Sequence, residues 1–250
     1  MKFSIITAVY NGEATLSDAL KSVASQRNCD VEHIIMDAGS TDSTLDIVKD
    51  YKNISKCSSE SDTGIYDGFN KGVLLANGDI IGFLNCDDFY PGPDVLAAVA
   101  LEFYTQPVDA VFGDILFVDR RDVTRIKRAY RSDRFKRELV ADGWMPAHPA
   151  LFIRREVFKK YGLFDTSYRI AADFEFVARI FYKHHLRYSY LPQNLVHMRT
   201  GGVSTSGIRS VWVIHNEVLR ACRENGVRTS RLKLIKKYPA KIMELVNRSA

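Results

Sequence analysis

The stretch IIGFLNCDDFYPG, residues 80–92, decides how the first half of this chain is interpreted. Its opening residues are apolar or small and indicate a buried strand. The strand runs into a polar segment that contains two adjacent aspartates, Asp87 and Asp88. Because like charges repel and each carboxylate resists leaving water, a positively charged group is expected beside this strand end.

Strand-like and helix-like segments alternate around this stretch. Apolar runs rich in β-branched residues predict buried strands, and apolar residues at three- and four-residue spacing predict helices. The expected strands cover 3–9, 31–37, 80–84 and 109–119, with a weaker one at 53–60. The expected helices cover 14–26, a segment that ends near 51, 64–76 and 92–104. This alternation predicts an α/β fold with a mostly parallel sheet flanked by helices.

Polar residues follow three of these strands. They are the segment 7–11, Asp37, and the pair Asp87 and Asp88. In a parallel sheet, ligands bind in the crevice beyond the carboxyl ends of the strands. We therefore expect the three polar groups to converge on one site.

The alternation breaks down after about residue 115. A helix is expected over 171–185, an edge strand over 187–191, and a long basic amphipathic helix from Ile208. We expect one domain over 1–205, in which 116–205 form the far wall of the cleft. Residues 206–250 form a basic helical C-terminal extension.

Composition narrows the class of protein. The chain has 250 residues, 46% of them hydrophobic, and a net charge of +5, which is typical of a soluble globular protein and too small to imply nucleic acid binding. The four cysteines are scattered along the chain and none belongs to a CxxC pair, a pattern that fits a reducing compartment. Neither a signal-peptide pattern nor an apolar run of about 20 residues is found. We expect a cytoplasmic protein, at most peripheral on the inner face of the cytoplasmic membrane.

The positive charge is concentrated in two segments. Arginine and lysine are dense over 120–137 and again over 220–241. Each run is either a solvated face or a contact with an anionic surface or a phosphate-bearing ligand.

Adjacent carboxylates at a strand end are natural ligands for Mg²⁺ or Mn²⁺, which also bridge to substrate phosphates. The alternative is a polar loop start in which Asp88 or Asp94 caps the next helix. Neither G-x-G-x-x-G nor a Walker A loop follows the first strand. A nucleotide would instead be held around its base and ribose. The residues expected to do so are Thr7, Ala8, Tyr10 and Asp37.

Four segments, in this order, resemble the family 2 glycosyltransferases. They are SIITAVYNGEATLSDALKSVASQ, IIMDAGSTDST, DTGIYDGFNKGVLLANGDIIGFLNCDD and IAADFEFVARI. The likeness covers most of residues 1–205 and is greatest to bacterial transferases of O-antigen and colanic-acid synthesis. The resemblance implies a GT-A fold, with a nucleotide-sugar-binding half over 1–115 and an acceptor half over 116–205. It also implies an inverting transfer of a sugar from a nucleotide-diphosphate donor.

The resemblance assigns roles position by position. On the donor side it implies a nucleotide pocket lined by Thr7, Tyr10 and Asn11, with Asp37 on the base or ribose. Asp87 would lie near the ribose and Asp88 on the metal, with Asn70 and Lys71 in a segment near the donor. Asp173 matches the catalytic base, and His148 matches a segment on the acceptor side.

The chain departs from the family pattern in one respect that matters for the metal. A strict D-x-D would place an acid at position 86, where this chain has Cys86, and the two aspartates are adjacent instead. Which of Asp87 and Asp88 binds the metal therefore stays open. The Q-x-x-R-W motif of processive synthases is absent, so a transferase that adds one sugar is expected.

Other interpretations remain at single positions. Asp173 could serve only as an acid in the first turn of a helix, where the dipole favours it. His197, in a loop-like context, is a candidate late metal ligand. The basic C-terminal helix could rest on an anionic membrane that carries a lipid-linked saccharide acceptor.

Two other functions are compatible with such a pocket. A sugar-nucleotide nucleotidyltransferase also pairs a metal with a nucleotide sugar, although it usually carries a glycine-rich basic loop that YNGEAT lacks. The other function is a non-catalytic nucleotide-binding scaffold, which would have no need of all four candidate site aspartates, namely Asp37, Asp87, Asp88 and Asp173. For the donor, a UDP-sugar is expected by analogy, with GDP as the alternative.

Overall fold

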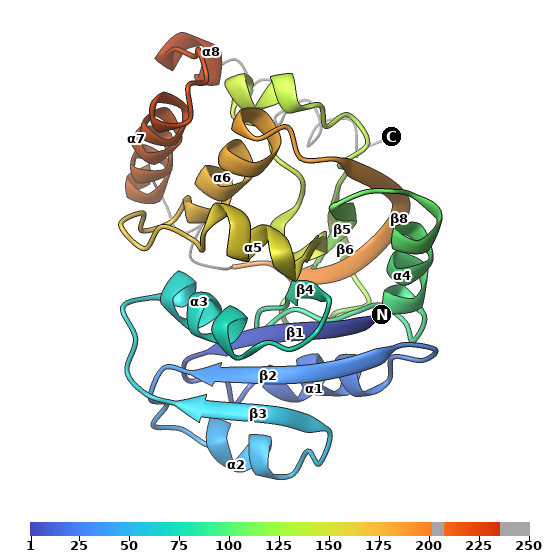
Figure 1. Ribbon diagram of the computed structural model, residues 1–250. Helices are drawn as coiled ribbons and strands as arrows, with labels where there is room; N and C mark the ends of the chain where they lie inside the picture. Colours follow the sequence, from blue (N-terminus) through green and yellow to red (C-terminus); the bar gives the residue numbers. More distant parts are fainter. Residues whose placement is uncertain (202–207, 236–250) are drawn as a thin grey trace.

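The computed structural model describes residues 1–201 and 208–235, and within these ranges the chain folds around one mixed sheet of eight strands (Figure 1). The strands are β1 Lys2–Val9, β2 Asp30–Asp37, β3 Ile54–Ser59, β4 Ile80–Phe83, β5 Ala110–Val118, β6 Ile126–Tyr130, β7 Leu151–Arg154 and β8 Tyr188–Arg199. They pair in the order β3-β2-β1-β4-β7-β5-β6, and β8 pairs with β5.

Helices cover both faces of this sheet. They are α1 Leu16–Ala24, α2 Thr44–Lys49, α3 Ile65–Leu75, α4 Val95–Thr105, α5 Arg155–Tyr161, α6 Ala172–Val177, α7 Ile208–Glu224 and α8 Arg231–Ile235. Two 3-10 turns, η1 Arg137–Asp142 and η2 His148–Ala150, and the π-helical segment η3 Ala178–Lys183 complete the described elements.

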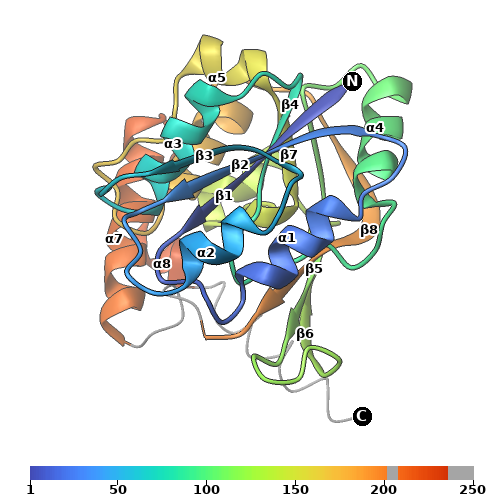
Figure 2. The same ribbon diagram turned by 90° about the horizontal axis from the view of Figure 1, so that it is seen from below.

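The first half confirms the predicted parallel sheet. Strand β1 is central and pairs in parallel with both β2 and β4. Its side chains alternate between two cores, with Ile6 and Ala8 in the cluster that contains α3 and Phe3 and Ile5 in the cluster that contains α1. Figures 1 and 2 show α3 on one face of this half and α1 with α2 on the other.

The second half is mixed in direction. Strand β7 lies between β4 and β5 and is antiparallel to both, whereas β8 runs parallel to β5. Strands β6 and β7 are not apparent in the sequence, because β7 has only four residues and β6 has only five, with two charged residues at its centre and none buried. The edge strand expected over 187–191 continues to Arg199, so His197 lies in a strand and not in a loop.

The helix expected over 171–185 begins as α6 and continues as the wider turns of η3. The expected basic helix is confirmed as α7. Its residues Val218, Ala221 and Cys222 are buried in the same cluster as Phe174 of α6, so α7 packs onto the domain. Among the described helices, none is both long and apolar enough to cross a bilayer. Residues 206–207 and 236–250 of the expected extension lie outside the described ranges.

Helix α3 lies so close to β1 that Gly72 has no room for a side chain, since a Cβ there would lie 2.4 Å from Ile6 Cγ2. We expect Gly72→Ala to destabilise the protein by about 1–3 kcal/mol, because overpacking outweighs the roughly 1 kcal/mol gain in helix propensity. Urea unfolding followed by circular dichroism measures the change. The matched control is Gly92→Ala, where nothing lies within 4 Å of the added Cβ and the expected change is below about 0.5 kcal/mol. Equal stability of the two variants would contradict this account of the α3–β1 contact.

Candidate active site

The carboxyl ends of β1, β2 and β4 lie at one edge of the sheet, as predicted. In the parallel register Val9 is opposite Asp37, and Ile6 is opposite Phe83. The turn after β1, the turn after β2 and the segment that carries Asp87 and Asp88 therefore start from neighbouring strands.

Asp37, the last residue of β2, is buried at this edge. Its Oδ2 accepts hydrogen bonds from the N–H groups of Gly39 (3.1 Å) and Ser40 (3.0 Å) and from the hydroxyl of Ser59 (2.6 Å). Its Oδ1 is buried without a partner. Because a buried acceptor without a partner costs free energy, this oxygen is suited to an N–H or O–H group of a bound base or ribose.

Two residues expected in the nucleotide pocket lie in the core instead. Thr7 is 0% exposed, and its hydroxyl lies 3.0 Å from Nε2 of His33. Ala8 packs in the cluster that contains α3. The expectation that Thr7 and Ala8 line the pocket is corrected, because a strand covered on both faces buries successive side chains on opposite sides.

The next two residues do reach the surface. Tyr10 is 62% exposed at the end of β1 and offers an aromatic ring for stacking. Asn11 adopts a left-handed conformation (φ 49°), and its Oδ1 accepts a hydrogen bond from the N–H of Thr41 at 2.9 Å. Its own N–H donates to the Ser40 hydroxyl at 2.8 Å, so Asn11 ties the turn after β1 to the turn after β2.

An arginine lies beside the paired aspartates, although its ion pair is with another acid. Arg199, the last residue of β8, is buried and donates from Nη1 to the carbonyl oxygen of Asp87 at 2.7 Å. Its guanidinium also forms an ion pair with Asp18 of α1. The backbone N–H of Arg199 donates to Asp88 Oδ1 at 3.2 Å, and Asn85 Nδ2 donates to Asp88 Oδ2 at 2.9 Å.

Sequence reasoning missed both of these partners. Arg199 stands two residues after His197, in a segment noted only for its histidine, and Asn85 precedes the aspartates directly. The available signal for Arg199 was a basic residue at the end of a strand-like segment. No sequence pattern, however, shows that residue 199 contacts residue 88.

The carboxylates fit a hard divalent cation. Burial raises the pKa of Asp88 well above its usual value, and the neighbouring Asp87 carboxylate adds to the rise, so a cation here would relieve an unfavourable charge. Asp88 is fully buried, whereas Asp87 is half-buried. In the described part of the chain, no group of three or more His, Cys, Asp or Glu residues is arranged to hold a metal. Two protein carboxylates are nevertheless enough for Mg²⁺ or Mn²⁺, which keep waters and bind substrate phosphates.

His197 is engaged with Phe89. The two backbones pair through hydrogen bonds of 3.0 and 2.8 Å, and the two rings meet edge to face at 5.2 Å. The structure thus places the imidazole against an aromatic ring.

Asp173 lies in the first turn of α6. Its Oδ1 accepts a hydrogen bond from the N–H of Phe174 at 2.7 Å. Burial raises the pKa of Asp173, and nearby His148 and Tyr66 act in the opposite direction. A carboxylate with a raised pKa is a stronger base than an exposed one, which is the property that a general base requires.

His148 lies in an aromatic cluster, near enough to Asp173 for each to shift the pKa of the other. The His148 ring stacks on Phe83, the last residue of β4, at 5.3 Å and 19°, and also contacts Phe69 and Phe164. Burial lowers the pKa of His148, and Asp173 raises it. Its Nε2 is buried without a partner. His148 therefore packs against the end of β4 and carries an unused polar atom.

Two residues expected near the donor have other partners. Asn70 donates from Nδ2 to the Phe164 carbonyl oxygen and accepts from the Phe164 N–H, both at 2.9 Å. Both polar atoms of the Asn70 amide are therefore used in holding Phe164, and its donor contact stays a prediction. Lys71 forms ion pairs with Glu60 (3.3 Å) and Asp67 (3.5 Å), so a diphosphate there would have to compete with two carboxylates.

Comparison with known sequences defines the family. The family model for glycosyl transferase family 2 matches residues 4–162. A PGL/p-HBAD biosynthesis glycosyltransferase of Mycobacterium bovis (strain BCG / Pasteur 1173P2) is 37% identical over 186 residues, which cover 72% of this chain and 69% of that protein. An uncharacterised glycosyltransferase of Nostoc sp. is 30% identical over 185 residues, covering 69% of this chain and 57% of that protein. The chain belongs to glycosyl transferase family 2.

Solved structures show the same fold. Staphylococcus aureus TarS 1-349 in complex with UDP-GlcNAc has a TM-score of 0.70 at 20% identity, covering 88% of this chain and 66% of that one. Glucosyl-3-phosphoglycerate synthase from Mycobacterium tuberculosis, in complex with Mn²⁺, UDP and glucosyl-3-phosphoglycerate, has a TM-score of 0.61 at 17% identity, covering 92% of this chain and 81% of that one. The fold is GT-A. This chain spans just under two thirds of the length of the TarS fragment.

Arg199 joins three elements through one guanidinium, so a shorter cation should not replace it. We expect Arg199→Lys to destabilise the protein by about 2 kcal/mol, because one of its charge-assisted hydrogen bonds is lost and a buried acceptor is left without a partner. Thermal unfolding measures this loss.

The control for that variant is Arg187→Lys. Arg187 is exposed and its bond to Asp109 is long at 3.4 Å, so the expected change is below about 1 kcal/mol. If the two lysine variants unfold at the same temperature, Arg199 does not hold the aspartate segment in place.

Proposed function

We propose that this protein is an inverting glycosyltransferase that moves a sugar from a nucleotide-diphosphate donor to an acceptor hydroxyl. The observation that carries the proposal is the placement of Asp173. Burial raises the pKa of its carboxyl, nearby His148 lowers that pKa, and His148 stacks on the last residue of the strand that leads to Asp87 and Asp88. This arrangement supports a base near the candidate diphosphate site.

The donor is held from the strand ends. The unpartnered Oδ1 of Asp37 accepts a hydrogen bond from the base or ribose, and the exposed ring of Tyr10 stacks on the base. A UDP-sugar is our expected donor, with a GDP-sugar as the alternative. These two donor classes are supported by structural neighbours, one in complex with UDP-GlcNAc and one with GDP-Man and Mn²⁺.

Asp173 removes the proton from the acceptor hydroxyl, whose oxygen attacks the anomeric carbon from the face opposite the nucleotide. The bond from that carbon to the diphosphate breaks as the new bond forms, and the configuration inverts. No covalent sugar–enzyme intermediate is required, which fits a site with one candidate base. A Mn²⁺ or Mg²⁺ ion held by Asp88 and Asp87 would stabilise the charge that grows on the leaving diphosphate.

The acceptor is proposed to be a saccharide or a lipid-linked saccharide of bacterial surface polysaccharide synthesis. The M. bovis relative, named for PGL/p-HBAD biosynthesis, supports a surface glycoconjugate. We further propose that the protein works in the cytoplasm, peripherally on the inner membrane face. Exposed Trp212 and Arg223 of α7 support contact of this helix with an anionic bilayer.

Nucleotide binding tests the donor side. Calorimetric titration with UDP, GDP and dTDP, each with and without Mn²⁺, is expected to show one nucleotide whose affinity rises with the metal. In Asp88→Asn that gain should disappear, because the substitution removes a carboxylate charge from the cation site. The matched control is Asp94→Asn, an exposed acid six residues further on, which should keep the gain. Absence of binding by all three nucleotides would overturn the proposed donor site.

The pH dependence tests the base. Asp173 accepts a proton only when it is ionised, and burial raises its pKa, so kcat/KM should fall as the pH drops through that raised value. The groups that face it are His148 and Tyr66. Asp173→Asn should lower turnover by about 10²- to 10⁴-fold and remove this acid limb. The control is Asp165→Asn, on the preceding loop, which should keep both the wild-type turnover and the acid limb of the pH profile.

The reaction products separate the remaining functions. Release of nucleoside diphosphate agrees with a glycosyltransferase, and release of pyrophosphate would indicate a nucleotidyltransferase. If Asp173→Asn turned over the donor as fast as the wild type, Asp173 would not be the base.

A further inference from the structure

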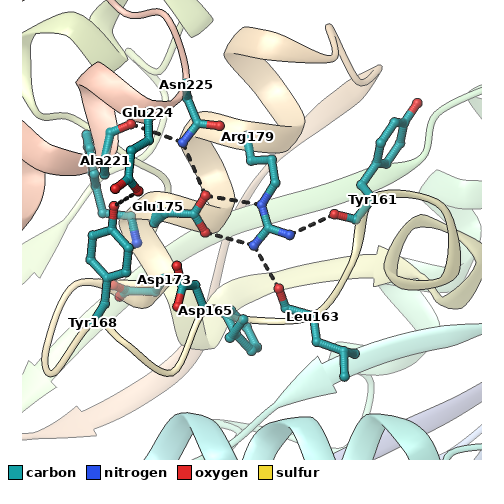
Figure 3. Close-up of polar contacts among 12 residues, drawn as sticks. Tyr161, Leu163, Asp165, Tyr168, Asp173, Glu175, Arg179, Ala221, Glu224 and Asn225 are labelled. Carbon is teal, nitrogen blue, oxygen red and sulfur yellow. Dashed lines mark hydrogen bonds and ion pairs between the residues drawn. The ribbon is translucent and has the colours of Figure 1, made fainter.

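Asp173 is reached through a segment, residues 162–171, that has no regular secondary structure. At its start, Asn70 of α3 binds both backbone polar groups of Phe164. The guanidinium of Arg179 donates to the carbonyl oxygens of Tyr161 and Leu163, each at 2.7 Å. Figure 3 shows how the same guanidinium also pairs with Glu175. The beginning of the segment is therefore fixed to α3 and η3.

The end of the segment is held by one carboxylate from α7. Glu217 accepts hydrogen bonds from three consecutive backbone N–H groups, those of Arg169 (2.7 Å), Ile170 (3.0 Å) and Ala171 (2.8 Å). Oε1 takes the first and Oε2 takes the other two. Hydrogen bonds to a charged acceptor are about twice as strong as neutral ones, so this single side chain orders the approach to α6.

Tyr66 of α3 holds the same point from the other side. Its hydroxyl donates to the carbonyl oxygen of Ile170 at 2.5 Å, while the N–H of Ile170 donates to Glu217. Tyr66 is also close enough to Asp173 for each to shift the pKa of the other, and the Glu217 carboxylate contributes to the raised pKa of Tyr66 after burial and Asp173. The backbone just before Asp173 is thus clamped between α3 and α7.

We propose that Glu217 is a positioning residue for the general base Asp173, which makes α7 part of the catalytic apparatus. The inference rests on the proposed function of Asp173. Three bonds converge two to four residues before the carboxyl that must meet the acceptor hydroxyl, and a displacement of about 1 Å at such a group can cost about 10²-fold in rate. Glu217 touches no reacting atom and acts only through the 169–171 backbone.

The test is Glu217→Gln. The amide has the same length but replaces one acceptor oxygen with a donor that faces the N–H groups, so one or two of the three bonds are lost. We expect kcat to fall about 10- to 100-fold, while the affinity for the nucleotide is unchanged because Asp37 and Tyr10 belong to other elements. UDP-GlcNAc, UDP-glucose, GDP-mannose and dTDP-glucose serve as probes. Turnover is the release of nucleoside diphosphate from whichever of them the wild type hydrolyses fastest.

The matched control is Tyr168→Phe. It removes one hydrogen bond between the same segment and the same helix, from the Tyr168 hydroxyl to Glu224 Oε2 at 2.6 Å, and leaves the 169–171 N–H groups untouched. Tyr168→Phe should lower the thermal midpoint yet keep kcat. Amide hydrogen exchange should quicken at 169–171 in Glu217→Gln and not in Tyr168→Phe.

Three results would overturn the inference. One is a wild-type kcat in Glu217→Gln. Another is a parallel loss of kcat and nucleotide affinity, which marks a general effect on folding. A third is an equal loss of kcat in Tyr168→Phe. If the wild type hydrolyses none of the four donors and binds no nucleotide, the proposed function itself fails and the inference falls with it.

Discussion

The parallel pairing of β1 with both β2 and β4 is the constraint on which the site depends. A strand bonded on both edges and covered on both faces has no freedom to shift register without turning its apolar side chains toward the wrong layer. Ile6 packs under α3, with Gly72 allowing the close approach, and Ile5 packs on the other face. Because the three strands run in one direction, Tyr10, Asp37 and the segment of Asp87 and Asp88 leave the sheet at one edge.

Elements from the second half complete that edge through buried charge. Arg199 brings a guanidinium to the segment of Asp87 and Asp88 from the end of β8, and Arg179 of η3 forms a largely buried pair with Glu175 of α6 (Figure 3). A buried ion pair loses much of its Coulomb attraction to desolvation unless further hydrogen bonds satisfy it. Both arginines meet this condition, since Arg179 also binds two carbonyl oxygens and Arg199 also binds the Asp87 carbonyl oxygen. Arg199 therefore fixes loop backbone at the candidate metal ligands, and Arg179 fixes the start of the loop that leads to the candidate base Asp173.

The differences between expectation and structure have local causes. The alternation of strand-like and helix-like segments predicted the strands and helices of the first half well, since long periodic segments carry a strong signal. Thr7 was expected in the pocket because it is polar and near a strand end. It lies within β1, however, and its hydroxyl contacts His33 in the core. Asn70 was expected near the donor by motif position, yet its amide matches the backbone of Phe164, a contact between α3 and a distant loop. Pairings over such separations leave no trace in local periodicity.

By itself, the sequence determined the α/β alternation, the polar strand ends and the motif set of the family, because strand and helix periods and turn chemistry are local properties. It also singled out Asp37, Asp87, Asp88 and Asp173 as the acids of interest. Only the tertiary structure decided which groups face them: Arg199 beside the paired aspartates, His148 and Tyr66 beside Asp173, and Glu217 behind the loop that leads to α6. Those contacts arise where separate elements pack together, and burial there shifts the pKa of Asp88 and Asp173 in a way that no stretch of chain alone can set.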